Sequence, residues 1–501
     1  YANENAHLLQ DILRKDWGFD GAVVTDWGGS NDHALGVKNG STLEMPCPGG
    51  DSIRELMKAV KDGKVAEADL DARLDELLEL VLSTHAAVEK APRTFDAAAH
   101  HALARRAAAE SIVLLKNEDG ILPLKAGEKL AVIGDFAQTP RYQGAGSSAV
   151  NALQVDALLD CIKADDSGIS FVGYASGFDR QGAADPKKQE EAVSLAKQAD
   201  TVLLCLGLDE LRESEGLDRA DMALAENQQQ LLDAVAAVNP NVVVLLSAGA
   251  PVETPWVGRC KALVYGALSG QAGAGAAADI LTGKLCPCGK LSQTWAKAHD
   301  DTPAKANFGG EGRNVEYREG LYVGYRYYQT AGVKPAFPFG YGLSYTTFEY
   351  SGLKADETGV TLTVTNPGSA AGAEIVQLYV AKPDAKVFRP EQELKGFAKV
   401  SLAPGESKTV AIALDDKAFR YWNVKTNAWE VEGGSYQLRV GASSVDIRLT
   451  ADITVKGTNA PDPYAGLSLT HYVSGQITYV TDAEFEALLG HPIPEDVVRI
   501  D

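Results

Sequence analysis

The spacing of apolar residues changes once along this chain, and that change limits the folds it can adopt. Up to about residue 300, continuous apolar runs such as Thr201–Gly207 and Val242–Ser247 alternate with helical patterns. This alternation predicts an α/β layer whose parallel strands are covered on both faces. From about residue 347 every second residue is apolar, as in Val360–Val364 and Tyr436–Val440, which predicts a β-sandwich. The expected fold class is therefore α/β plus all-β.

Residues 1–92 are predicted to be the C-terminal part of an incomplete (β/α) barrel. Helical patterns at Asn5–Lys15 and Glu67–Leu82 flank two runs typical of buried strands, Gly21–Thr25 and Ser41–Met45. Two strands cannot form such a sheet, since a barrel of this type closes with eight. We therefore expect this segment to end a larger domain, and we interpret Tyr1 in place of Met as the sign of a cut or a missing partner.

Four further parts follow in this prediction. Residues 93–300 are expected to form a doubly wound α/β sandwich, 301–346 a folded connector, 347–455 a β-sandwich and 456–501 a tail with a short helix at Asp482–Leu489. The strands expected in the second part are Ser111–Leu115, Leu130–Gly134, Ser170–Tyr174, Thr201–Gly207, Val242–Ser247 and Ala262–Val264. Its expected helices are Ala97–Ala109, Lys187–Gln198, Asn227–Val238 and Ala272–Leu281.

Charge and composition narrow the function classes. The chain has 47 Lys plus Arg against 68 Asp plus Glu, a net charge of −21. This balance disfavours nucleic acid and anionic membrane surfaces as partners but is compatible with a neutral sugar. Six cysteines in 501 residues are too sparse for a disulfide scaffold, so we expect free thiols in a reducing, cytoplasmic compartment. The histidines show no metal-ligand spacing, and no metal or organic cofactor is expected.

Asp26 is the first candidate catalytic residue. It directly follows the run Gly21–Thr25 and precedes Trp27. A carboxylate at the C-terminal end of a barrel strand lies where barrel enzymes hold their catalytic groups, and the adjacent indole offers an apolar surface for a sugar ring. The alternative interpretation is that Asp26 caps a helix starting near Ser30.

The second candidate lies in an acidic loop, Asp209–Arg219, which follows the buried run Thr201–Gly207. We expect this loop at the ligand-binding edge of the α/β sheet. Crowded carboxylates raise the pKa of some of their members, as a general acid requires near neutral pH. The alternative is a solvated run of charge. Composition does not choose among the four carboxylates Glu210, Glu213, Glu215 and Asp218.

A series of motifs, in one order across nearly the whole chain, resembles glycoside hydrolase family 3, the β-glucosidase family. The motifs are Gly18–Trp27, Leu43–Pro46, Ser111–Asn117, Gly144–Ser148, Glu215–Arg219, Pro251–Trp256, Tyr322–Tyr328, Pro338–Tyr345, Gln377–Val380, Arg389–Pro390 and Leu394–Phe397. The resemblance implies a barrel, an α/β sandwich and a fibronectin type III-like domain. It also implies that Asp26 is the nucleophile, that Glu215 is the acid/base, that Trp27 borders the sugar pocket and that Met45 lies near it.

The resemblance implies a retaining, exo-acting β-glycosidase without a cofactor, with β-glucosides the first expectation and β-xylosides the alternative. Two departures from the family pattern matter. Thr42 stands where family members often have Asp, and the sugar-holding first half of the barrel is absent. We therefore expect that half as a partner, from the same precursor or a separate chain, and a homo-oligomer is also open. A non-catalytic carbohydrate-binding remnant is the alternative from another class.

Overall fold

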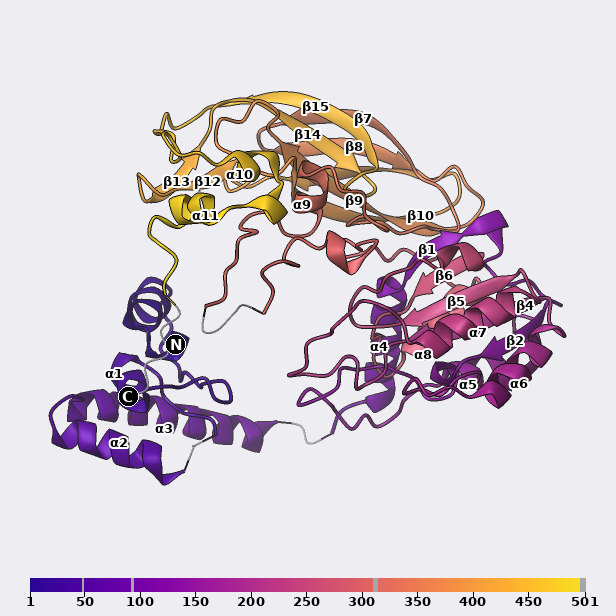
Figure 1. Cartoon of the computed structure of the whole chain (residues 1–501), viewed down its shortest axis with the longest axis horizontal. Coiled ribbons are helices and arrows are strands. Elements are labelled where there is room, and N and C mark those ends of the chain that lie inside the picture. Colours follow the sequence, from indigo (N-terminus) through magenta and orange to yellow (C-terminus); the bar gives the residue numbers. More distant parts are fainter. Residues whose placement is uncertain (47–48, 92–93, 310–313, 496–501) are drawn as a thin grey trace. The chain divides into compact units, whose positions relative to one another are not determined.

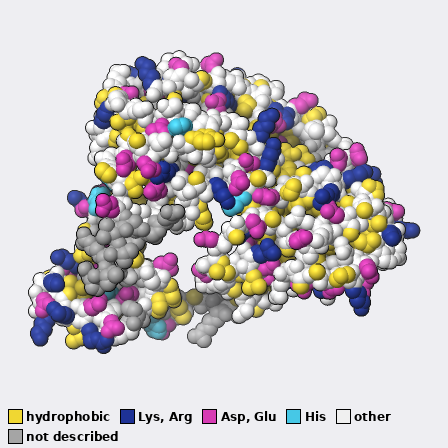
Figure 2. All heavy atoms as spheres, in the orientation of Figure 1, with side chains coloured by type: hydrophobic (Ala, Val, Ile, Leu, Met, Phe, Trp, Pro, Cys, Tyr) yellow, Lys and Arg dark blue, Asp and Glu magenta, His cyan; other side chains and the backbone are white. Residues whose placement is uncertain are grey.

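The computed structural model describes residues 1–46, 49–91, 94–309 and 314–495 (Figure 1). The chain forms two compact units, Tyr1–Asp96 and Ala97–Asp501. The predicted boundary between residues 92 and 93 lies outside the described residues, as does Cys47. In Figure 2, acidic and basic side chains are interspersed over the visible face.

The first unit is mostly helical. Short helices at Ala2–Glu4 and His7–Asp16 precede α1 (His33–Asn39), α2 (Gly50–Lys61) and α3 (Glu67–Lys90). The two predicted strands are reduced to a single parallel bridge between Val24 and Leu43. A parallel pair needs neighbouring strands and cover on both faces, and residues 1–46 and 49–91 supply no further strand and no closed barrel. The prediction of two strands was therefore wrong in extent, although it identified the pairing segments.

The second unit begins with a six-stranded sheet in the order β1-β6-β5-β4-β2-β3. The strands are β1 (Val113–Asn117), β2 (Lys129–Ile133), β3 (Ser170–Ala175), β4 (Thr201–Gly207), β5 (Val242–Ser247) and β6 (Ala262–Tyr265). All neighbouring pairs are parallel except β1 with β6. The helices are α4 (Ala97–Ser111), α5 (Leu158–Lys163), α6 (Pro186–Ala196), α7 (Glu226–Ala236) and α8 (Gly273–Leu281). Helix α8 packs against α4 and α5, and α6 packs against α7.

The observed sheet agrees with the predicted α/β layer most closely where burial is complete. Strands β4 and β5 have the predicted bounds, and every residue of β4 is buried. The prediction was wrong at Ser111, which ends helix α4. It also omitted α5, because a helix of six residues is too short to show a helical period.

The chain then passes through α9 (Tyr325–Thr330) into two packed antiparallel sheets. One has the order β10-β9-β14-β15 and the other β11-β8-β7. These strands are β7 (Glu349–Asp356), β8 (Gly359–Thr365), β9 (Gly372–Ala381), β10 (Glu393–Leu402), β11 (Ser407–Ala413), β14 (Gly434–Gly441) and β15 (Ile447–Val455). Residues such as Leu362, Val376 and Leu438 form the shared core, so the alternating pattern correctly predicted a sandwich.

A hairpin and the tail complete the second unit. Strands β12 (Arg420–Asn423) and β13 (Ala428–Val431) form a separate two-stranded sheet. Helices α10 (Thr470–Ser474) and α11 (Asp482–Leu489) lie in the tail, and α11 has the predicted bounds because Thr481 caps it and Gly490 ends it. No helix in the described part of the chain combines the length and apolar character needed to cross a membrane.

Candidate active site

Asp26 follows a short parallel pairing of two segments in the first unit. Thr42 donates its N–H to Val23 O (2.8 Å), and Thr25 donates its N–H to Leu43 O (3.0 Å). Asp26 is exposed, and its Oδ1 accepts a hydrogen bond from the N–H of Trp27 (2.7 Å). Its Oδ2 has no hydrogen-bond partner among the described residues. One carboxylate oxygen is thus fixed by the backbone while the other is open to solvent.

The alternative interpretation of Asp26 as a helix cap is wrong. The next helix, α1, begins at His33, and Asp32 is its N-cap. The Oδ1 of Asp32 accepts from the N–H of Leu35 (2.9 Å), which is the usual capping contact. The Asp26 side chain therefore serves no helix.

Trp27 and Met45 lie close to Asp26 along the same pairing. The Trp27 side chain is 67% exposed, so its indole face is available for contact. The N–H of Met45 donates to Thr25 Oγ1 (2.9 Å). This hydrogen bond joins the segment that contains Met45 to Thr25, the residue before Asp26. Asp26, Trp27 and Met45 therefore belong to one local structure.

A buried charged cluster, which no sequence motif indicated, holds these segments in place. The Thr42 hydroxyl accepts from the N–H of Val23 (2.9 Å) and donates to Glu76 (2.6 Å). Glu76 pairs with Arg14 (2.9 Å) and Arg73 (2.6 Å), and all three side chains are at most 14% exposed. Thr42, noted only as a departure from the family pattern, thus links the segment before Asp26 to helix α3.

The acidic loop of the second unit begins at the point where the strand connections of its sheet reverse direction. Strands β2 and β4 are parallel neighbours, but β2 leads to β3 on one side and β4 leads to β5 on the other. Such a switch point opens a crevice at the carboxyl ends of the strands, where α/β proteins bind ligands. The segment Gly144–Ser148 comes from the β2 loop and Glu215 from the β4 loop. The expected position of Glu215 at this edge is therefore observed.

These two loops pair with one another around Glu215. Ala145 and Ser214 form a parallel bridge, and Glu215 donates its N–H to Ala145 O (3.1 Å). The backbone of Gly146 has a φ of +107°, and a Cβ there would lie only 2.6 Å from the Cβ of Glu215. Only glycine allows this close approach without displacing the Glu215 side chain.

Ser147 holds the Glu215 carboxylate in its charged form. The Ser147 N–H donates to Glu215 Oε2 (2.6 Å), and the Ser147 hydroxyl makes a second hydrogen bond to the same atom. These hydrogen bonds, the hydroxyl first, lower the pKa of Glu215. Crowding was expected to raise the pKa of some carboxylates in this loop. For Glu215 the shift has the opposite direction, because the carboxylate is exposed and accepts both hydrogen bonds from Ser147.

Two of the four candidate carboxylates have structural partners. Arg180 donates to both oxygens of Glu210 (2.7 and 3.1 Å). Glu213 Oε2 accepts from the N–H of Gly249 (2.9 Å) and lies 3.8 Å from the buried Arg141. Because these carboxylates hold the loop in place, they are poorly suited to exchange a proton with a ligand.

The other two candidates, Glu215 and Asp218, are exposed. Of these, Glu215 is the one fixed against a second loop. Asp26 belongs to one unit and Glu215 to the other, so the structure describes each half of the candidate site by itself. No group of three or more His, Cys, Asp or Glu in the described residues could hold a metal ion.

Three family models match this chain. They are the glycosyl hydrolase family 3 N terminal domain at residues 2–80, the glycosyl hydrolase family 3 C-terminal domain at 112–345 and the fibronectin type III-like domain at 374–444. Asp26, Trp27 and Met45 lie in the first match and Glu215 in the second.

Characterised relatives agree with these matches. Thermostable beta-glucosidase B from Acetivibrio thermocellus is 44% identical over 91% of this chain and 62% of its own length. An exo-alpha-(1->6)-L-arabinopyranosidase from Bifidobacterium breve is 44% identical over 92% of the chain and 63% of its own length. The chain thus spans about three fifths of the length of these curated relatives.

A solved structure extends the likeness to the fold. The crystal structure of a Bifidobacterium adolescentis family 3 beta-glucosidase superposes with a TM-score of 0.85 and 42% identity, covering 95% of this chain and 71% of that one. Identity at this level over most of both chains requires common descent as well as a common fold. The chain belongs to glycosyl hydrolase family 3.

Proposed function

We propose that this chain is part of a retaining, exo-acting β-glycosidase that releases a terminal β-D-glucose, and that it carries both catalytic carboxylates, Asp26 and Glu215. The observation that carries the proposal is the open carboxylate of Asp26, held by the Trp27 N–H inside the segment that matches the family's N-terminal domain. The beta-glucosidases among the relatives support glucosides as the substrate class. Trp27 and Met45 are proposed to border the sugar.

In the first step, the open oxygen of Asp26 attacks the anomeric carbon of the sugar. The glycosidic carbon–oxygen bond breaks as protonated Glu215 gives its proton to the leaving oxygen, which leaves a covalent glycosyl-Asp26 ester. In the second step, Glu215 takes a proton from water, and the water oxygen attacks the same carbon. The ester bond breaks, the sugar leaves, and both carboxyl groups return to their starting states.

Ser147 determines how readily Glu215 can hold the proton that the first step consumes. The Ser147 N–H can only donate, so it favours the carboxylate over the acid. The hydroxyl can reverse and accept from the protonated form, which keeps one contact in both states. We therefore expect Ser147 to set the protonation of the acid/base.

We further propose that residues 1–92 end a (β/α) barrel that is completed by further strands from the same precursor or a separate chain. The support is the lone bridge between Val24 and Leu43, since a parallel pair is stable only within a larger covered sheet. The alternative partner is a second copy of this chain, which would form a homo-oligomer. Copurification with analytical ultracentrifugation distinguishes a barrel-sized partner from a homo-oligomer.

Covalent trapping tests the nucleophile. The enzyme, with any partner it requires, is incubated with 2,4-dinitrophenyl 2-deoxy-2-fluoro-β-D-glucoside, and the labelled peptide is identified by mass spectrometry. We expect the label on Asp26, and Asp26→Ala should lose the label and on the order of 10⁴-fold in kcat. A label on another residue, or near-normal turnover by Asp26→Ala, contradicts the assignment. A correctly assembled enzyme that hydrolyses no glycoside instead supports the non-catalytic carbohydrate-binding remnant.

Azide rescue tests the acid/base. Glu215→Ala should lose about 10²–10⁴-fold in kcat/KM on substrates whose leaving group needs a proton. On 2,4-dinitrophenyl β-D-glucoside, whose leaving group needs no proton, the glycosyl ester still forms, and added azide should restore turnover by attacking it. Asp218→Ala is the matched control, because Asp218 is also exposed in the same loop. Rescue of Asp218→Ala and not of Glu215→Ala would transfer the role to Asp218.

A second substrate class is favoured by the relatives named exo-alpha-(1->6)-L-arabinopyranosidase, which are as similar to this chain as the beta-glucosidase from Acetivibrio thermocellus. α-L-Arabinopyranosides and β-D-xylosides share the equatorial glycosidic bond of β-D-glucosides but lack the C6 hydroxymethyl group. Comparing kcat/KM on the three 4-nitrophenyl glycosides decides among them. The highest value on the glucoside supports the first proposal, and a higher value on either pentoside replaces it.

A further inference from the structure

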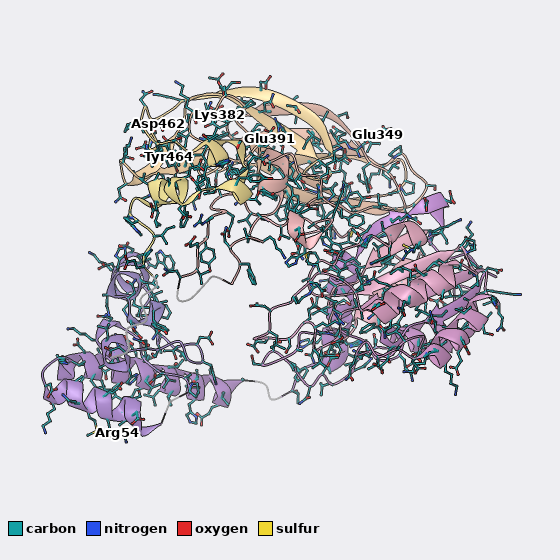
Figure 3. The ribbon with its side chains drawn as sticks, viewed as in Figure 1. Arg54, Glu349, Lys382, Glu391, Asp462 and Tyr464 are labelled. Atoms are coloured by element: carbon teal, nitrogen blue, oxygen red, sulfur yellow. The ribbon has the colours of Figure 1, made fainter. Side chains whose placement is uncertain are left out.

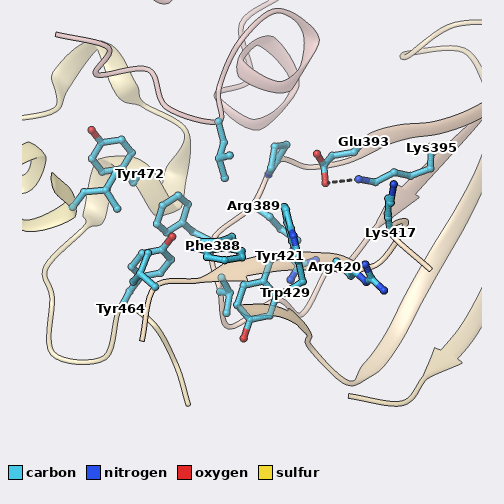
Figure 4. A pocket seen from close by; sticks show the side chains of 16 residues that line it. Phe388, Arg389, Glu393, Lys395, Lys417, Arg420, Tyr421, Trp429, Tyr464 and Tyr472 are labelled. Atoms are coloured by element: carbon cyan, nitrogen blue, oxygen red, sulfur yellow. Dashed lines mark ion pairs between the residues drawn. The ribbon is translucent and has the colours of Figure 1, made fainter. Parts of the chain in front are cut away.

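A cavity of about 670 Å³ opens beside the β-sandwich, away from the loops that carry Glu215 and Ser147 (Figure 4). Its walls come from the β12–β13 hairpin, the segment around Phe388 and Arg389, and the tail. Its volume falls within the roughly 300–1,000 Å³ of small-molecule sites. Nothing in the proposed glycosidase mechanism uses it.

One end of the cavity is a rigid aromatic wall. Phe388 stacks on Tyr464 with ring centroids 4.7 Å apart, and Tyr472 lies 5.8 Å from the same Phe388 ring. Tyr464 and the neighbouring Asp462 belong to the tail (Figure 3). Phe388, Tyr464 and Tyr472 together line this end of the cavity.

The hairpin contributes two further aromatic surfaces. Trp422 and Trp429 are directly opposite across β12 and β13, so both side chains project from the same face. They are 43% and 59% exposed. The hairpin is anchored from behind, because buried Asn423 donates its amide Nδ2 to Pro461 O (2.8 Å) and Lys425 Nζ donates to Asp462 O (2.8 Å). The indoles are therefore exposed on a fixed support.

The other end of the cavity is cationic. Its lining includes the four basic residues Arg389, Lys395, Lys417 and Arg420 and the single acidic residue Glu393. Figure 4 labels Lys395, Lys417 and Arg420 on the side of the cavity away from Tyr464 and Tyr472.

Three of these cations also have acidic partners. Arg389 pairs with Glu432 (3.1 Å), Lys395 with Glu393 (3.3 Å) and Arg420 with Asp416. Lys417 has no ion pair among the described residues, so its ammonium is available to a ligand. Such a group of cations stands out in a chain of net charge −21.

We propose that this cavity binds an acidic oligosaccharide. The exposed indoles stack on the apolar faces of sugar rings, while Lys417 and Arg420 bind a ring carboxylate through charge-assisted hydrogen bonds. A ligand carboxylate is favoured over a neutral hydroxyl because it can form an ion pair with the ammonium of Lys417. The site is separate from Asp26 and Glu215, so its occupancy does not depend on the proposed hydrolysis.

Calorimetric titration of the enzyme with trigalacturonate, against cellotriose as the neutral probe, tests this proposal. We expect trigalacturonate to bind and cellotriose to bind at least tenfold more weakly, with trigalacturonate affinity falling as salt rises. Trp429→Ala and Lys417→Ala should each weaken trigalacturonate at least tenfold. Lys408→Ala, a lysine on the opposite sheet of the sandwich, should not, and Trp429→Phe should retain part of the affinity.

Each other outcome overturns the proposal. Equal binding of cellotriose indicates a neutral-sugar surface, displacement of trigalacturonate by equimolar benzoate indicates a site for aromatic acids, and no binding indicates no site. Binding that both Trp429→Ala and Lys417→Ala leave intact places the ligand elsewhere. Hydrolysis of an aryl glucoside should be unchanged in both variants, so failure of this proposal is distinguishable from failure of the proposed catalysis.

Discussion

The contact between Ser147 and Glu215 determines the chemistry expected of the second catalytic carboxylate. A general acid works best with a pKa near the working pH, yet the two hydrogen bonds from Ser147 lower the pKa of Glu215. The resting structure therefore favours the base required in the second step over the acid required in the first. We expect the proton on Glu215 to be lost at a lower pH than for an unperturbed glutamate.

This contact gives a pH prediction. Ser147→Ala removes the hydroxyl hydrogen bond and raises the pKa of Glu215, so the acid stays protonated to higher pH. The alkaline limb of the kcat/KM profile should therefore move to higher pH. Ser148→Ala is the control, because no hydrogen bond from Ser148 to Glu215 is present in the described structure. A limb that stays in place in Ser147→Ala, or moves equally in Ser148→Ala, contradicts the assignment.

At the scale of elements, the pairing of two loops positions Glu215. Strands β2 and β4 fix the loop bases, and the bridge between Ala145 and Ser214 joins the loops beyond the sheet. Gly146 is the point of closest approach.

Gly146→Ala tests this arrangement. The new Cβ would overlap Glu215, and a φ of +107° is strained for alanine by about 1–3 kcal/mol. Because displacement of a catalytic group by about 1 Å can cost 10²-fold in rate, we expect kcat to fall on the order of 10²-fold. Gly127→Ala has a similar positive φ of +81° but open space around it, so it should lower the melting temperature slightly and leave kcat unchanged. Equal kcat in the two variants would mean that the close approach has no catalytic role.

Sequence reasoning worked best for elements whose environment is uniform. The bounds of β4 and β5 were predicted because β4 is buried throughout and β5 is buried up to Leu246, so a continuous apolar run is enough to identify them. It failed for Gly21–Thr25, because an apolar run becomes a strand only when neighbouring strands supply hydrogen bonds. Whether such neighbouring strands exist depends on the surrounding fold and cannot be recognised from the residues of the run itself.

At the scale of the whole second unit, a buried ion pair joins the α/β layer to the sandwich. Lys290 follows α8 and pairs with Glu374 on β9 (2.9 Å), and the side chains are 11% and 7% exposed. Lys290 Nζ also donates to Gly342 O in the connector (2.8 Å). Three parts of the chain therefore depend on one ammonium group.

Lys290→Met should destabilise this unit by about 3–5 kcal/mol, because it leaves the buried Glu374 carboxylate without a cation, with the N–H of Ile375 (2.7 Å) still donating to it. Chemical denaturation measures the loss. Lys408→Met removes an exposed pair with Glu406 and should cost less than about 1 kcal/mol. Adding Glu374→Leu to Lys290→Met should recover part of the stability, and a double variant no more stable than the single one would show that the unpaired charge is not the cause.

The sequence by itself determined the α/β layer, the sandwich and the positions of two candidate carboxylates, because apolar period and local motifs are encoded by neighbouring residues. Apart from the family resemblance, it left four acidic residues open in the loop after β4. The tertiary structure separated them, since Arg180 and Gly249 engage Glu210 and Glu213 across 30 and 36 residues, and Ser147 holds Glu215 across 68. Such contacts depend on which strands lie side by side, and strand order follows from the packing of the whole sheet.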